Sequence, residues 1–237
     1  MQVGSGSCTY EWIDNWARIP DTPSGRENGR THGVEVLADG RVVVFDQADP
    51  AVLILDADGN LLESWGDRFA GAHGLSLTRD NGAEQLWLTD QASCEVVRTS
   101  LDGQSLQTID RPDVPAYRDG GKYSPTWVAV NPANGDVWVA DGYGSGLVHR
   151  FDKSGRRLST LDGDGGAGRF NCPHAIWFDS RKDEPELYVA DRGNRRVQVF
   201  DGEGSFKRVF GEDFLTSPCS FAAHGDLLLV PELRARV

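Results

Sequence analysis

The chain of 237 residues carries 24 Lys and Arg against 36 Asp and Glu, a formal net charge of −12. This charge argues against nucleic acid and anionic membranes as partners, because phosphate groups are bound by clustered Lys and Arg. An apolar content of 39% is enough for a sizeable core, but 28 Gly and 11 Pro interrupt the chain too often for a mainly helical fold.

From residue 32 onward one short unit recurs five times. Each copy has a polar residue, an apolar strand of about five residues, a turn and a second strand that ends in an acidic residue. The copies run from His32 to Asp46, His73 to Asp90, Thr126 to Asp141, His174 to Asp191 and Ser220 to Glu232. Their starts are 41, 53, 48 and 46 residues apart, and a period of about 45 residues made of strands is typical of a β-propeller.

Each unit continues with a third strand, a turn rich in Asp and Gly that suits a hairpin, and a fourth strand. The third strands are expected at 51–55, 95–100, 146–151, 195–200 and 233–237. Four antiparallel strands make one propeller blade, so the sequence predicts an all-β propeller in a single domain, 1–237. Its blades are expected at 30–66, 71–110, 123–162 and 172–212, with an incomplete fifth at 217–237.

Two ways of closing the ring remain open. Residues 9–17 resemble the fourth-strand pattern of residues 61–65. They are therefore predicted to supply the outer strand that a five-bladed ring still needs, because an open ring leaves unpaired strand edges. The alternative is a six-bladed ring whose last blade is absent from this chain.

The cysteines and the N-terminus bear on where the protein works. Cys8, Cys94, Cys172 and Cys219 form no CxxC pair, and we expect free, partly buried thiols. Cys172 and Cys219 both precede an inner strand, so a disulfide or a shared metal between them is an alternative. The N-terminus lacks the regions of a signal peptide and no apolar run approaches the roughly 18 residues of a membrane span, so we expect a cytoplasmic protein with no membrane partner.

Two families resemble this chain. The stretch ELYVADRGNRRVQVFDGEGSFKRVFG, residues 186–211, resembles NHL repeats. Among NHL propellers, residues 123–156 and 170–201 are most similar to the peptidyl-α-hydroxyglycine α-amidating lyases. That resemblance implies a zinc ion bound by three histidines on separate blades and a tyrosine that acts as base.

The lyase resemblance also implies a reaction, the cleavage of a peptidyl-α-hydroxyglycine into a peptide amide and glyoxylate. His73 and His174 stand at positions similar to the first two zinc ligands, and Tyr143 in DGYG matches the tyrosine. The third ligand of the family belongs to a last blade that this chain lacks. Gln47 stands where the family carries an arginine.

The register of the repeat predicts the same site from geometry. His32, His73 and His174 each directly precede an inner strand, and this position recurs around the central channel of a propeller. The end of each second strand returns to the same rim, which places Gln47, Tyr143 and Arg192, each just beyond an acidic residue, beside the histidines. Because imidazoles are good zinc ligands, we predict His32, His73 and His174 as metal ligands. The lyase resemblance implies Tyr143 as the base, and Arg192 is predicted as the cation beside it.

Other polar residues receive different predictions. The acidic residues that recur in every blade are expected to bond turns rather than to catalyse; they are Asp46, Asp90, Asp141 and Asp191. The loop 111–125 is expected to lie near the rim as an ordered surface loop, with contact of Tyr117, Arg118 and Lys122 to a ligand carboxylate as the alternative. His149 and His224 are assigned no role.

Three functions fit these patterns. The first is a metal-dependent lyase, with zinc as its cofactor, acting on a small-molecule or peptide ligand in the central channel. The second is a non-catalytic NHL scaffold that binds a protein or peptide partner. The third is a lactonase-like hydrolase with calcium as its cofactor. Such a site would need acidic and Asn ligands at the positions where this chain has His and Thr.

Overall fold

The computed structural model describes residues 1–6, 8–28 and 31–233. Strands dominate these residues. Their helical parts are α1 (Pro23–Asn28) and two single turns of 3-10 helix, η1 (Pro115–Tyr117) and η2 (Arg192–Asn194). No helix among them is long and apolar enough to cross a membrane.

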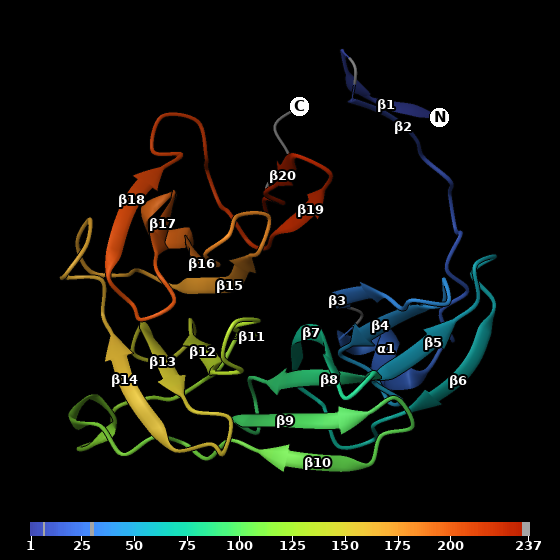
Figure 1. Cartoon of the computed structure of the whole chain (residues 1–237). Coiled ribbons are helices and arrows are strands. Elements are labelled where there is room, and N and C mark those ends of the chain that lie inside the picture. Colours follow the sequence, from blue (N-terminus) through green and yellow to red (C-terminus); the bar gives the residue numbers. More distant parts are fainter. Residues whose placement is uncertain (7, 29–30, 234–237) are drawn as a thin grey trace.

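Four complete blades surround a common centre, and in each the four antiparallel strands follow one another in chain order from the centre outward (Figure 1). Blade one comprises β3 (Thr31–Val36), β4 (Val42–Asp46), β5 (Val52–Leu55) and β6 (Leu61–Trp65). Blade two comprises β7 (Ala72–Asp80), β8 (Ala83–Asp90), β9 (Glu95–Ser100) and β10 (Ser105–Thr108). Blade three comprises β11 (Trp127–Val130), β12 (Val137–Asp141), β13 (Leu147–Phe151) and β14 (Arg157–Leu161). Blade four comprises β15 (Pro173–Asp179), β16 (Glu186–Asp191), β17 (Arg196–Phe200) and β18 (Phe206–Phe210).

The next position after blade four holds a two-stranded sheet of β19 (Ala222–His224) and β20 (Leu227–Leu229). A single bridge between Pro218 and Glu232 extends it. The third strand predicted at 233–237 falls almost wholly outside the described residues. The structure thus confirms an all-β propeller with four-stranded blades, while a total of five or six blades stays a prediction.

The core lies between the blades rather than inside any one of them. Successive strand residues point to opposite faces of a sheet, and the middle strands of each blade are apolar at nearly every position, so both faces are buried. Trp87 is 2% exposed between blades two and three, and Trp138 is 0% exposed between blades three and four. These tryptophans are therefore packing residues and not part of a ligand site.

The outer closing strand predicted at residues 9–17 does not form in the described residues. Instead β2 (Cys8–Glu11) pairs with β1 (Gln2–Ser5) in a hairpin that stands away from the blades (Figure 1). The chain then crosses the free face of blade one, where Trp16 and Ala17 pack on an apolar cluster. The reason is local: the hairpin satisfies its own backbone, and blade one offers the nearest apolar cover for Trp16.

The crossing also explains one glycine. Gly59 lies in the turn between β5 and β6 with a φ of +79°, and a Cβ at this position would stand 1.9 Å from the Trp16 carbonyl oxygen. The Gly59 carbonyl in turn accepts the N–H of Arg18 at 2.9 Å. Only glycine fits such a close approach at positive φ.

Candidate functional site

The acidic residue that ends each second strand ties down the segment leading into the inner strand of its own blade. In blades two, three and four the carboxylate accepts a hydrogen bond from a backbone N–H. The donor residue lies two or three positions before the residue that faces the channel. The donors are Gly71, Ser124 and Asn171, at 2.8, 2.6 and 2.8 Å from Asp90, Asp141 and Asp191. The recurring acids bond turns, as the sequence predicts, and so hold the rim residues in place.

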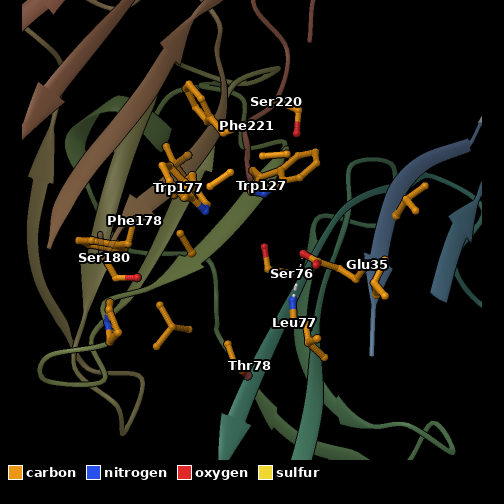
Figure 2. A pocket seen from close by; sticks show the side chains of 18 of the residues that line it. Glu35, Ser76, Leu77, Thr78, Trp127, Trp177, Phe178, Ser180, Ser220 and Phe221 are labelled. Carbon is orange, nitrogen blue, oxygen red and sulfur yellow. Dashed lines mark hydrogen bonds between the residues drawn. The ribbon is translucent and has the colours of Figure 1, made fainter. Parts of the chain in front are cut away.

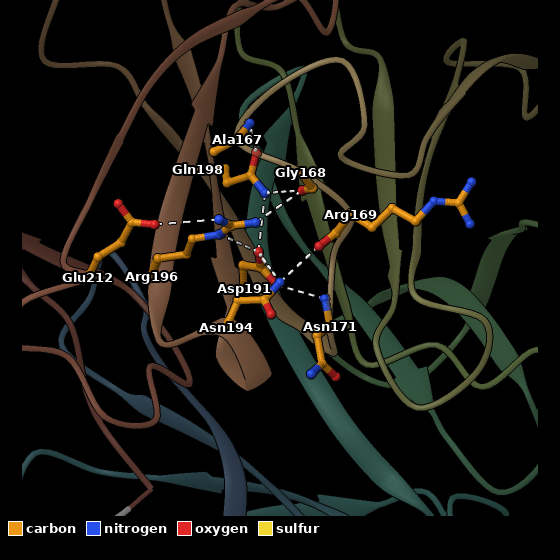
Figure 3. Close-up of polar contacts among 9 residues, drawn as sticks. All are labelled: Ala167, Gly168, Arg169, Asn171, Asp191, Asn194, Arg196, Gln198 and Glu212. Atoms are coloured by element: carbon orange, nitrogen blue, oxygen red, sulfur yellow. Dashed lines mark hydrogen bonds and ion pairs between the residues drawn. The ribbon is translucent and has the colours of Figure 1, made fainter.

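Blade four shows this arrangement most fully (Figure 3). The Asp191 carboxylate also accepts hydrogen bonds from Asn194 Nδ2 at 2.9 Å, Arg196 Nε at 2.8 Å and Gln198 Nε2 at 3.1 Å. Asp191 is 0% exposed, so these donors replace water around its charge. The network fixes η2, whose first residue is Arg192.

Two histidines and a tyrosine from three blades meet at the rim. His73 is the second residue of β7, the inner strand of blade two, and His174 is the second residue of β15 in blade four. The Nε2 atoms of both lie 3.1 Å from the hydroxyl of Tyr143, which follows β12 in blade three. The two imidazole centroids are 4.8 Å apart and their planes meet at 68°. The structure brings these residues together; their chemical role remains a prediction.

Backbone carbonyls orient both imidazoles. Nδ1 of His73 lies 2.8 Å from the carbonyl oxygen of Thr126, and Nδ1 of His174 lies 2.8 Å from that of Cys219. A carbonyl can only accept, so Nδ1 carries the hydrogen and each Nε2 presents a lone pair. Burial, reinforced by the neighbouring His174, lowers the pKa of His73 to about 3. Burial and the charge of Arg192 lower the pKa of His174 to about 4, so both rings are neutral near pH 7.

The site holds fewer hydrogens than its acceptors need. The Tyr143 hydroxyl can donate to only one of the two Nε2 atoms, so the other lone pair faces the same oxygen at 3.1 Å without a hydrogen between them. Arg192 Nη1 lies 3.4 Å from that oxygen and donates to it. This pattern of converging lone pairs is satisfied by a cation that accepts electron pairs.

His32 lies beside this pair. Its ring stacks on that of His73, with centroids 4.4 Å apart and an angle of 27° between planes. Within the described residues no group of three or more His, Cys, Asp or Glu side chains has the geometry of a metal site. Two histidines present lone pairs to one point, and His32 as a third metal ligand stays a prediction.

The thiols near the site are free. All four cysteines are unpaired and half-buried, which confirms the prediction of free thiols, and no Cys172–Cys219 disulfide is formed. The Cys219 thiol donates a hydrogen bond to the Ser217 carbonyl at 3.2 Å.

The loop 111–125 does not supply the ligand contact considered for Tyr117. That residue is 6% exposed, and its hydroxyl donates to Asp141 Oδ2 at 2.8 Å and lies 2.6 Å from His149 Nε2. His149, to which the sequence assigned no role, continues the chain of bonds to Thr160 Oγ1 at 2.9 Å. The aromatic residue is thus a structural link between the loop and blade three.

The basic residues of the loop have their own contacts. Arg118 pairs with Asp113 at 3.1 Å on the exposed side of the loop. The carbonyl of Lys122 accepts the hydroxyl hydrogen of Ser145 at 2.9 Å. Contact of either side chain with a ligand carboxylate remains a prediction.

A cavity of about 830 Å³ occupies the centre of the propeller and is lined by residues of the inner strands (Figure 2). His32 lies in its wall, so the cavity adjoins the histidine cluster. Glu35 is the acidic side chain among the lining residues, and sequence reasoning missed it. The sequence pattern could have indicated Glu35, because in HGVEV it occupies a strand position at which the other inner strands carry Ser, Ala or Trp.

Comparison with known proteins finds homologues of two kinds. Human NHL repeat-containing protein 3 is 31% identical over 215 residues, which is 82% of this chain and 59% of that protein. Peptidyl-glycine alpha-amidating monooxygenase B of Xenopus laevis is 30% identical over 176 residues, 70% of this chain and 20% of that protein. A probable peptidyl-alpha-hydroxyglycine alpha-amidating lyase of Caenorhabditis elegans is 25% identical, over 74% of this chain and 56% of that protein. No protein-family model matches.

Solved structures agree on the fold. A streptogramin B lyase structure superposes with a TM-score of 0.60 at 16% identity, covering 86% of this chain and 61% of the other. A chain of the nidogen/laminin complex gives a TM-score of 0.57 at 15% identity, with coverage of 76% and 62%. Identities this low show a shared architecture and nothing about activity.

Proposed function

Because the chain is a homologue of NHL repeat-containing protein 3 and of the peptidylglycine α-amidating enzymes, we propose that it is a metal-dependent lyase with its site at the rim of the central channel. His73 and His174 are the proposed ligands, and the substrate is small and polar or peptidyl. The observation that carries the proposal is that both Nε2 atoms lie 3.1 Å from one hydroxyl.

The donor set fits zinc in its chemistry. Neutral imidazoles whose other nitrogen donates to a backbone carbonyl are the usual state of histidine ligands. A catalytic zinc site normally has three protein ligands, and His32, in stacking contact with His73, is the proposed third. When bound, the metal would supply Lewis acidity toward a substrate oxygen.

Tyr143 is the proposed base. Its oxygen lies between the two histidines, so a substrate hydroxyl at the cluster would be within reach of it. Arg192 Nη1 donates to that oxygen, and Arg192 Cζ lies 5.2 Å from the centre of the phenol ring. The guanidinium thus places positive charge where negative charge develops when the phenol gives up its proton, the task that Gln47 cannot perform in blade one.

A non-catalytic scaffold is the second candidate. NHL repeat-containing protein 3 matches a larger share of this chain than the amidating enzymes given above. The described residues form no three-ligand metal group, and Gln47 replaces the arginine expected from the lyase resemblance. We do not propose the calcium-dependent hydrolase, because calcium takes six to eight oxygen ligands whereas the rim offers imidazoles.

Two measurements separate the candidates. After zinc supplementation and desalting, the wild-type protein should retain about one zinc per chain, and the double variant His73→Ala/His174→Ala should retain none. His224→Ala, at an exposed histidine in β19, is the matched control and should behave as wild type. Equal metal content in all three proteins would overturn the metal site.

The second measurement is release of glyoxylate from an acyl-peptidyl-α-hydroxyglycine. Wild type should release it and Tyr143→Phe should not, while the variant keeps its zinc. Zinc retention without turnover in wild type would leave the metal site standing and favour the scaffold.

A further inference from the structure

The third residue after each rim position lines the central cavity in all five repeats. These residues form one level of the channel, and they are Glu35, Ser76, Ala129, Trp177 and Ala223. At this level of the channel the carboxyl of Glu35 is therefore surrounded by side chains that are small, hydroxylic or aromatic. The level lies three residues along each inner strand from the histidine cluster, so it is a separate feature of the channel.

The Glu35 carboxyl accepts the backbone N–H of Leu77 at 3.3 Å, and within the described part of the chain it forms no ion pair. Burial raises the pKa of Glu35 to about 7, a rise that the bond from Leu77 only partly offsets. A half-buried carboxylate without a counter-ion is disfavoured, and a positive ligand would remove that cost.

The walls around Glu35 suit a cation that carries an apolar body. Ser76 Oγ gives its hydrogen to the carbonyl of Val128 at 2.6 Å, so its lone pairs are left to accept from a ligand. Trp127 and Trp177 line the cavity across from Glu35 and Ser76 (Figure 2). The indole of Trp127 can attract a cation and pack on hydrocarbon, while Trp177, which stacks on Phe221 and lies under Arg181, adds apolar wall.

The neighbouring basic group is already neutralised. Arg181 lies 5.8 Å from the Trp177 ring, but its guanidinium pairs with Asp179 at 2.7 Å. An anionic ligand would thus meet Glu35 without a free positive charge to balance it. A divalent metal ion would find one carboxylate where six or more oxygens are usual.

We propose that the central cavity binds an organic ammonium group, with Glu35 as its counter-ion, Ser76 as a hydrogen-bond acceptor and the apolar part of the ligand against Trp127 and Trp177. A cavity of about 830 Å³ has room for such a body, since ligand sites commonly measure 300 to about 1,000 Å³. Binding in the cavity does not require the metal proposed at the rim.

The test uses dansylcadaverine, a fluorescent primary amine, and its N-acetyl derivative, which has the same body without the charge. Fluorescence anisotropy with EDTA-treated protein should show binding of the amine about tenfold or more tighter than of the acetyl compound. Glu35→Gln should lose that preference. Glu63→Gln, at an exposed carboxylate of β6, is the matched control and should keep it.

Two outcomes would overturn the proposal: equal affinity for the two probes, or a Glu35→Gln protein that still prefers the amine. Urea unfolding of each variant verifies that it is folded, and the comparison of probes on wild type needs no variant. His73→Ala/His174→Ala should still bind the amine, so failure of the metal site leaves this proposal testable. Competition by Gly-Lys-Gly but not by its acetyl-lysine form assigns the ammonium to a peptide side chain; competition by n-butylamine alone assigns it to a small amine.

Discussion

Replacing Asp191 by Ala should destabilise the propeller more than any exposed carboxylate replacement. The change removes the acceptor of three side-chain donors and of the Asn171 N–H. Arg196, whose side chain is 11% exposed, then keeps its charge without its buried partner. Breaking a buried ion pair costs about 3–5 kcal/mol, so we expect a loss in this range. Asp191→Asn should cost about half, because one of its two oxygens can still accept.

Urea unfolding followed by circular dichroism measures the loss. Asp201→Ala is the matched control on the same blade, since Asp201 accepts only the N–H groups of Glu203 and Ser205 in an exposed turn. It should cost about 1 kcal/mol. If Asp191→Ala fell within about 1 kcal/mol of that control, the recurring acid would not be the anchor of the rim.

Three further predictions concern stability. Glu35→Gln should raise the free energy of unfolding by up to about 3 kcal/mol at pH 8 and little at pH 5. The pKa of Glu35 is about 7 in the folded protein against an ordinary 4.5, so ionisation of this carboxyl destabilises the folded state as the pH rises. Identical effects on the urea midpoint at both pH values would contradict this. In the Glu35→Gln protein, with EDTA present, lowering the pH from 8 to 5 should reduce the free energy of unfolding by about 2 kcal/mol for each of His73, His149 and His174. Their folded pKa values lie at about 3, 4 and 4, so the unfolded chain takes up protons below pH 6.5 and the folded chain does not; a flat profile is the opposing result. Trp16→Ala should lower the free energy of unfolding by about 1–2 kcal/mol because it uncovers the apolar face of blade one. Deletion of residues 1–12 should change the melting temperature little. A larger loss of stability from the deletion than from Trp16→Ala would show that the hairpin stabilises the ring.

The blades could be predicted because every one repeats the same signals at the same register. The polar residue, the two apolar strands, the glycine turn and the terminal acid each have a physical reason to recur. The same register predicts which side chains reach the rim, and His73, Tyr143, His174 and Arg192 do lie together. The register does not predict the direction in which each imidazole points its Nε2 atom, because backbone carbonyls of other blades set this orientation.

The N-terminal segment shows where pattern fails. Residues 9–17 look like an outer strand, but strand pairing depends on which edge is nearest in space, and the Gln2–Ser5 strand lies nine residues or fewer from its partners in Cys8–Glu11. Tyr117 fails for a related reason: its position in a loop at the rim says nothing about the buried Asp141 and His149 that take its hydroxyl. Glu35 looks like an ordinary exposed strand residue until the neighbouring blades surround it.

The most direct test of the rim site is anomalous diffraction at the zinc edge from crystals grown with zinc. Our account predicts a peak about 2.0 to 2.1 Å from Nε2 of both His73 and His174, with the Tyr143 hydroxyl displaced from its place between them. No peak at the rim, with the hydroxyl still 3.1 Å from each ring, would contradict it.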